Sequence, residues 1–178
     1  MKSKNAIIFS YDGFQDAELI YPYHRLLGDK FNVNIFANKN EIFGISGVKF
    51  SDCKLFFDIT KLNVDDYSLV VVPSGVKALE KLRQENIVID FIKDWDSKNK
   101  IIASICNGMQ LLISAKIIKG KRVSAYYAMS IDVENAGAEF VDAPYVISDN
   151  IISCPHYKWM GLWMEEVIRF YNEKNKKN

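Results

Sequence analysis

The stretch IIASICNGMQLL, residues 101–112, begins as an apolar β-type run and ends as an apolar helical one. Cys106 lies between the two runs and is followed by an Asn-Gly pair. Where a strand turns sharply into a helix, only small neighbours fit, and here Ser104 and Gly108 flank the cysteine at two residues on either side. The spacing predicts a nucleophile elbow. A small apolar cysteine packed behind a buried strand is the alternative, and local sequence does not separate the two.

The rest of the chain alternates strand and helix patterns. Continuous apolar runs predict buried strands in residues 5–10 and 65–75, and alternation predicts a strand in residues 31–37. Three- and four-residue spacing predicts helices from Asp16, after Gly75 and from Trp159 to about Asn172. Pro22 should tighten the first turn of the first helix. Residues 38–60 suggest short strands or a hairpin. The pattern predicts an α/β fold, a mainly parallel sheet between helices, as one domain over residues 1–172 and a disordered polar tail at 173–178.

Composition excludes several classes of partner. The chain has 178 residues, 49% of them hydrophobic, and 23 Lys plus Arg against 22 Asp plus Glu, so neither nucleic acid nor an anionic membrane is expected to bind it. No segment has the length of a membrane span or the pattern of a secretory leader, which favours the cytoplasm. Cys53, Cys106 and Cys154 lack metal-ligand or disulfide spacing, so no metal is predicted and Cys53 and Cys154 are expected to be packing residues.

Three polar groups follow predicted strands and should meet at one edge of the sheet. These are the loop before Glu18, the Pro73-Ser74-Gly75 turn and Cys106. A helix that begins at Met109 would direct its positive end toward the thiol and favour the thiolate. Glu18 alone is ambiguous, because acidic residues in a first helical turn often only stabilise the helix dipole.

Four segments, in order, resemble the ThiJ/PfpI family, which includes the parkinsonism-associated protein deglycase. They are DGFQDAELIYPYHRLL (12–27), LVVVPSG (69–75), IIASICNGMQLLISAKIIKGKRVSAY (101–126) and IDVENAGAEFVDAPYVISDNIIS (131–153). The resemblance implies a flavodoxin-like three-layer fold related to class I glutamine amidotransferases. It also implies a homodimer or higher homo-oligomer and a small-molecule substrate, with no cofactor.

The resemblance also implies roles for individual residues. Cys106 matches the reactive cysteine of the family, and Glu18 matches a glutamate that is protonated, hydrogen-bonds the thiolate and shuttles a proton. The N–H groups of Gly75 and Asn107 would form an oxyanion hole. Ser74 stands where the family has a second glycine.

Two departures from the family bear on the chemistry. Asn107 occupies the position where the peptidase-like branch has histidine, which puts classical peptidase chemistry in doubt. His156, in the divergent segment 152–163, is a tentative replacement base, whereas His24 should point away from Glu18. Residues predicted to line the substrate pocket are Ser74, Tyr126 and Trp159, with Tyr127 as a further candidate, although core packing explains the aromatic ones equally well.

Three functions remain open on these residues. The first is a cofactor-independent cysteine enzyme that acts on a small carbonyl compound, of glyoxalase or deglycase type, with Cys106 as nucleophile and Glu18 as proton donor and acceptor. The second is a hydratase of the isonitrile-hydratase kind, which would use the same pair without the adjacent histidine. The third is a redox-sensing or chaperone-like stress protein that works through oxidation of Cys106.

Overall fold

A seven-stranded, mainly parallel sheet forms the centre of the molecule. The computed structural model describes residues 4–176. The strand order is β10-β11-β7-β6-β1-β2-β5, and only β10 runs antiparallel to its neighbour. The strands are β1 (Asn5–Phe9), β2 (Asn32–Ala37), β5 (Lys54–Leu55), β6 (Leu69–Val72), β7 (Ile101–Ile105), β10 (Val146–Ser148) and β11 (Ile151–Cys154). This order, with crossovers on both sides of β1, is that of a flavodoxin-like fold.

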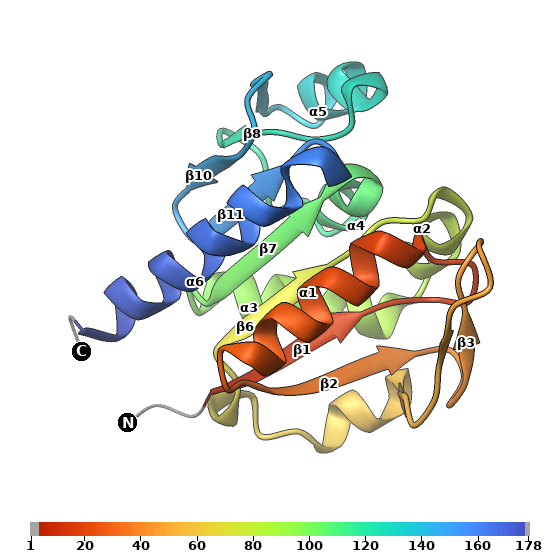
Figure 1. Cartoon of the computed structure of the whole chain (residues 1–178). Helices are drawn as coiled ribbons and strands as arrows, with labels where there is room; N and C mark the ends of the chain where they lie inside the picture. Colours follow the sequence, from red (N-terminus) through yellow and green to blue (C-terminus); the bar gives the residue numbers. More distant parts are fainter. Residues whose placement is uncertain (1–3, 177–178) are drawn as a thin grey trace.

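Helices cover both faces of the sheet, as Figure 1 shows. Helices α1 (Asp16–Gly28) and α6 (Met160–Lys176) pack side by side on one face, and α3 (Asn86–Ser97) and α4 (Met109–Ser114) lie on the other. Helix α2 (Val76–Leu82) packs against α4. The predicted three-layer α/β sandwich is confirmed.

The central strands are apolar because both of their faces are buried. Every residue of β6 and β7 is buried, as continuous apolar runs predict for parallel strands between two helical layers. Two buried tryptophans tie helices to the sheet, since the indole N–H of Trp95 donates to the Ile101 carbonyl at 3.0 Å and that of Trp163 donates to the Ile152 carbonyl at 3.1 Å. Because β1, β6 and β7 are parallel neighbours, their carboxyl ends lie at one edge of the sheet.

The first turn of α1 is tightened, as Pro22 predicts. The N–H groups of Glu18 and Leu19 both donate to the Gln15 carbonyl, at 3.1 and 3.3 Å. Asp16 fixes the start of this helix to the loop before β4 (Lys49–Phe50), because its carboxylate accepts the N–H of Ser46 at 2.8 Å and that of Val48 at 2.9 Å. Glu18 therefore lies on a firmly anchored turn.

The prediction of short strands or a hairpin in residues 38–60 is only partly correct. Strands β3 (Ile42–Phe43) and β4 (Lys49–Phe50) do form an antiparallel pair, but residues 56–61 form a 3-10 helix, η1. Asp58 stabilises this helix, because its carboxylate accepts the Leu55 N–H at 3.3 Å. The smaller elements that remain are η2 (Val64–Asp66), β8 (Arg122–Val123), η4 (Tyr127–Met129), α5 (Ser130–Asn135), β9 (Glu139–Phe140) and η5 (Tyr157–Trp159).

The last helix extends beyond its predicted end at Asn172. Helix α6 continues to Lys176, so residues 173–176 are helical and not part of a disordered tail. Lys174 donates to the Asn99 carbonyl, and Asn175 donates to the Tyr171 carbonyl at 2.8 Å. The remainder of the predicted tail, residues 177 and 178, lies outside the described residues.

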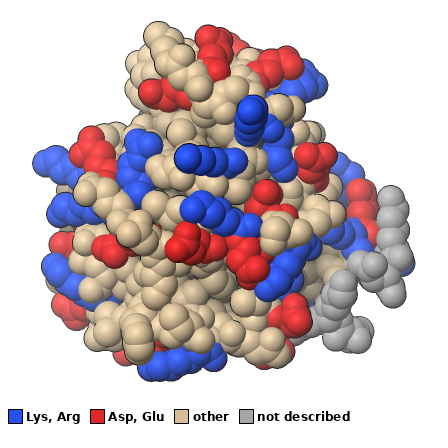
Figure 2. Space-filling view, turned by 180° about the vertical axis from the view of Figure 1, so that it is seen from behind, with Lys and Arg blue, Asp and Glu red and all other residues tan. Residues whose placement is uncertain are grey.

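Surface charge is mixed on the face that Figure 2 shows, where Lys and Arg are interspersed with Asp and Glu. Such interspersed charges produce no strong field of one sign. Between residues 4 and 176, no helix is both long and apolar enough to cross a membrane.

Candidate active site

Cys106 lies at a sharp turn between β7 and α4. Its φ angle is +56°, a left-handed conformation that side chains other than glycine rarely adopt. The turn continues through a short 3-10 helix, η3 (Cys106–Gly108), into α4. Gly108 is required there, since a Cβ atom at this position would lie 2.4 Å from the Val72 carbonyl oxygen and 3.0 Å from Ser104 Oγ. The predicted sharp strand-to-helix turn at Cys106 is therefore confirmed, and the backbone holds Cys106 in a strained, fixed position.

Gly108→Ala tests this packing. The new methyl group must push the elbow away from β6, and we expect a loss of about 1–3 kcal/mol in the free energy of unfolding, as for other overpacked sites. Alkylation of Cys106 should slow as the thiol moves. Urea unfolding and iodoacetamide kinetics measure the two effects. The control is Gly28→Ala, since nothing lies within 4 Å of a Cβ atom there. Equal stability of the two variants would contradict the tight fit.

Glu18, Ser74 and Cys106 form a buried polar cluster where β1, β6 and β7 end. Glu18 is only 1% exposed and Ser74 is 3% exposed. The Ser74 hydroxyl accepts the Asn107 N–H at 3.3 Å, and it also hydrogen-bonds to the Glu18 carboxyl and the Cys106 thiol. Ser74, which is predicted to contact substrate, thus lies between Glu18 and Cys106 and hydrogen-bonds to both side chains.

Burial dominates the titration of Glu18. It raises the pKa of this carboxyl to about 7, and hydrogen bonds from Ser74 and Cys106 partly offset the rise. One carboxyl oxygen, Oε2, is buried and lacks a hydrogen-bond partner. A carboxyl with a pKa near neutrality exchanges protons readily at physiological pH, as a general acid or base must.

The thiolate that the helix end was expected to favour is not the resting form of Cys106. Burial raises the pKa of the thiol to about 12, and the negative charge of Glu18 adds to the rise. Helix α4 has only six residues and begins three residues after the cysteine, so its positive end does not outweigh desolvation. In the structure the thiol donates to Asn107 Oδ1 at 3.5 Å. Attack by Cys106 therefore requires a base.

The two groups predicted for an oxyanion hole lie beside this cluster. Gly75 has a φ of +133°, and a Cβ atom there would lie 2.8 Å from the backbone N of Gln15 and 2.8 Å from Cα of Phe14. The Gln15 N–H also donates to the Ser74 carbonyl at 3.0 Å, so the loop after β1 and the turn after β6 are locked together. Asn107 is buried next to the thiol, with its N–H directed at Ser74 Oγ.

A pocket of about 270 Å³ lies next to the elbow. The Tyr126 N–H donates to the Cys106 carbonyl at 3.4 Å, which attaches the pocket wall to the turn at Cys106. The lining residues include Tyr126, Tyr127, Asp142, His156, Lys158 and Trp159. Four of the predicted residues, Tyr126, Tyr127, His156 and Trp159, are thus brought together.

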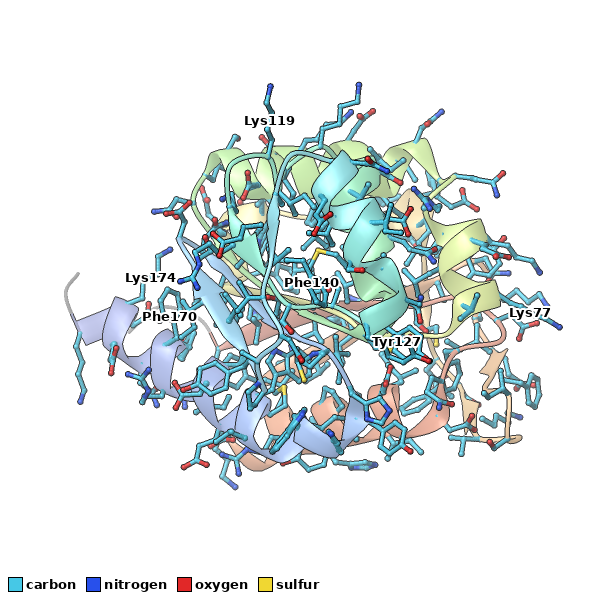
Figure 3. The ribbon with its side chains drawn as sticks, turned by 90° about the horizontal axis from the view of Figure 1, so that it is seen from above. Lys77, Lys119, Tyr127, Phe140, Phe170 and Lys174 are labelled. Carbon is cyan, nitrogen blue, oxygen red and sulfur yellow. The ribbon has the colours of Figure 1, made fainter. Side chains whose placement is uncertain are left out.

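His156 is held in the wall of this pocket by contacts within its own loop. Its Nδ1 accepts the Lys158 N–H at 3.3 Å, and its ring packs on Tyr157 with centroids 4.0 Å apart. A second, larger cavity of about 500 Å³ is bordered by Asn99, Phe170 and Lys174. Figure 3 shows Phe170 and Lys174 far from Tyr127, toward the C-terminal end of α6, so that cavity is separate from the elbow.

Comparison with known proteins agrees with this geometry. The family model described as the DJ-1/PfpI family matches residues 4–169. The chain belongs to the DJ-1/PfpI family. A deglycase of Pyrococcus abyssi is 34% identical over 163 residues, which cover 92% of this chain and 96% of that protein. A deglycase of Thermococcus kodakarensis is 35% identical over 164 residues, with the same shares covered. The crystal structure of a ThiJ/PfpI domain protein from Brachyspira murdochii superposes with a TM-score of 0.89 at 19% identity and covers 97% of this chain and 99% of that one.

Cys154 is a residue of this DJ-1/PfpI protein that sequence analysis placed only in the core. It is fully buried, as expected, but it ends β11, which pairs with β7 so that Cys154 lies opposite Ile105. Burial raises the pKa of Cys154 to about 12, and the charges of Glu18 and Cys106 add to the rise, which places all three groups in one electrostatic neighbourhood. The sequence signal that could have placed Cys154 near the site is its position at the end of a predicted strand.

The other titratable candidates lie elsewhere in the DJ-1/PfpI fold. Cys53 is buried near β4, where its thiol donates to the Phe50 carbonyl at 3.9 Å. His24 packs edge-on against Tyr23 in α1, six residues beyond Glu18. Within residues 4–176, no group of three or more His, Cys, Asp or Glu side chains is placed to hold a metal ion.

Proposed function

We propose that this protein is a cofactor-independent cysteine enzyme that acts on small carbonyl compounds such as 2-oxoaldehydes and their adducts, as a deglycase or glyoxalase does. One observation carries the proposal: the Cys106 thiol is fixed at the elbow beside a buried carboxyl, Glu18, whose pKa is about 7. The relatives at 34% and 35% identity are named deglycases, which supports the reaction class.

Glu18 supplies the base that Asn107 cannot. In its ionised form the carboxylate takes the thiol proton as Cys106 Sγ attacks the substrate carbonyl carbon, so a C–S bond forms and the carbonyl π bond becomes an oxyanion. The Gly75 N–H stabilises that oxygen, and so does the Asn107 N–H once it leaves the Ser74 hydroxyl that accepts it in the structure. Glu18 then returns its proton to the oxyanion to give a hemithioacetal, and the same carboxyl can move the protons of the later steps.

The pocket walls suit a small substrate. A volume of about 270 Å³ is small for a binding cleft, and aromatic faces from Tyr126 and Trp159 line it. His156 contributes its ring to the wall. Its Nδ1 already accepts the backbone N–H of Lys158, so only Nε2 remains to hydrogen-bond a substrate oxygen. We assign His156 to substrate binding and the base to Glu18. The cytoplasmic location stays a prediction.

Two other functions use the same residues. Hydration of an isonitrile is favoured by Asn107, since that reaction needs a nucleophile and an acid but no adjacent histidine. Redox sensing is favoured by the unpartnered Oε2 of Glu18, which in its protonated form would hydrogen-bond an oxidised sulfur on Cys106.

A substrate panel separates these functions. We expect the purified protein to convert methylglyoxal to lactate and to form lactate also from the adduct of methylglyoxal with N-acetylcysteine. An isonitrile and a peptide substrate should remain unchanged. Chromatography of the products measures each reaction. Consumption of the isonitrile alone would replace the proposal with hydration. If no compound is consumed while peroxide oxidises Cys106, redox sensing replaces it.

A further inference from the structure

Two cysteines end neighbouring strands at the active site. Cys154 lies opposite Ile105 in the parallel β7–β11 pair, and Cys106 is the next residue along β7. Neighbouring strands lie about 4.8 Å apart and rise about 3.3 Å per residue, so one further residue on β7 would have its Cα roughly 6 Å from that of Cys154. This spacing is within the about 4.4–6.8 Å that a disulfide needs, and the φ of +56° at Cys106 ends the strand alternation that would direct its side chain to the other face of the sheet.

The surroundings of the pair suit redox chemistry. Cys154 is fully buried, and its thiol donates to the His156 carbonyl at 3.5 Å, so it is shielded from outside reagents. Cys106 is only partly buried, and its backbone adjoins the pocket wall at Tyr126, so it meets an oxidant first. Glu18 Oε2, buried and unpartnered, lies in the same cluster as a proton carrier. We propose that Cys154 is a resolving cysteine, which captures peroxide-oxidised Cys106 in a reversible Cys106–Cys154 disulfide.

The chemistry balances with a peroxide as the only oxidant. Glu18 takes the Cys106 proton, and the thiolate attacks a peroxide oxygen. The S–O bond forms, the O–O bond breaks, and the leaving hydroxide takes the proton from Glu18 to become water. Cys154 sulfur then attacks the sulfenic sulfur of Cys106. An S–S bond forms, the S–O bond breaks, and the Cys154 proton leaves with the hydroxide as a second water. A dithiol restores both thiols.

Disulfide formation would protect the nucleophile and change the pocket. Without a resolving thiol, sulfenic acid oxidises further to sulfinic acid, which is not reduced by ordinary thiols. The bridge would also remove the hydrogen bond from Cys154 to the His156 carbonyl, which helps to hold the pocket wall. Oxidation would therefore stop turnover reversibly. This inference rests on the reactivity of Cys106 in the proposed function.

Mass spectrometry of the full-length protein tests the inference. After brief exposure to hydrogen peroxide, we expect the intact protein to be about 2 Da lighter than the reduced protein, because a disulfide lacks the two thiol hydrogens. Alkylation of the remaining free thiols then marks the cysteines that are not in the disulfide. Trypsin would release residues 101–116 joined to residues 123–158, while Cys53 remains alkylated in the peptide 50–54. Dithiothreitol should separate the two peptides and restore activity.

Variants provide the controls. On peroxide treatment, Cys154→Ser and the more apolar Cys154→Ala should gain about 16 Da and then 32 Da, as Cys106 becomes sulfenic and then sulfinic acid. Dithiothreitol should then no longer restore the activity of either variant. Cys53→Ser should behave as the wild type. Sulfinic acid on wild-type Cys106 without the linked peptides would overturn the role of Cys154 and leave the proposed function intact. If neither peroxide nor iodoacetamide modifies Cys106, both proposals fail. The wild-type peptide map decides the matter even if both variants of Cys154 misfold.

Discussion

Replacing Cys106 by serine is expected to lower turnover of 2-oxoaldehydes by at least about a thousandfold. Removal of the nucleophile of a catalytic unit has effects of this size or larger in other enzymes, and a serine hydroxyl beside Glu18 is far harder to ionise than a thiol. Lactate formation from methylglyoxal measures the loss. Cys53→Ser is the matched control and should retain full activity, because Cys53 is buried away from the site.

Cys106→Gly separates chemistry from folding. It also removes the nucleophile, but glycine adopts a φ of +56° without the cost of about 1–2 kcal/mol that a side chain incurs. We therefore expect an inactive protein that resists urea at least as well as Cys106→Ser. Turnover that survives in both variants would remove Cys106 from the mechanism, and a glycine variant less stable than the serine variant would contradict the strain at the elbow.

Replacing Glu18 by glutamine should remove the pH dependence of Cys106 reactivity near neutrality. In the wild type, alkylation by iodoacetamide should increase as pH rises through about 7, because only the ionised carboxylate accepts the thiol proton. Glu18→Gln cannot accept a proton, so we expect alkylation at pH 8 to be slower by about a hundredfold and to lack the inflection near pH 7. An unchanged rate would show that Glu18 acts only as a hydrogen-bond donor.

The same substitution has a predictable effect on stability. The native carboxyl has a pKa of about 7 against an ordinary value of 4.5, so the folded state binds more protons than the unfolded state between these pH values. The contribution of Glu18 to stability is therefore full below about pH 4.5 and is lost as pH rises through 7, by on the order of 3 kcal/mol. Subtracting the urea-unfolding curves of Glu18→Gln from those of the wild type isolates this slope. A difference independent of pH would contradict the raised pKa.

Much of the fold could be predicted from the chain alone. Strands β6 and β7 are buried on both faces, which forces continuous apolar runs, and the helices between them keep an apolar stripe that faces the sheet. The pattern of residues 38–60 predicts short strands or a hairpin and misses the 3-10 helix at residues 56–61. The Asp58 side chain instead stabilises a 3-10 helix, and such a contact depends on local geometry that no periodicity reveals.

The candidate site was predicted as a set of residues but not as an electrostatic environment. Cys106, Ser74 and the loop before Glu18 follow strands, and strand ends meet at one edge of the sheet, so the sequence predicts that they lie together. The role of Glu18 itself is implied only by the family resemblance. The raised pKa of Cys106 was missed because burial at the elbow comes from segments distant in the sequence. Cys154 was missed for a related reason: β11 is adjacent to β7 only through the sheet order.

The two outermost strands of the central sheet are very short. Strand β5 has two residues and β10 has three, so either border of the sheet offers few unpaired backbone groups to another chain. Short borders of this kind discourage strand-to-strand aggregation. Self-association, which the family resemblance implies, would then depend on side chains such as the exposed Phe43, Ile45 and Phe57. A homo-oligomer of this protein would then be held together by contacts between side chains, without a sheet shared between subunits.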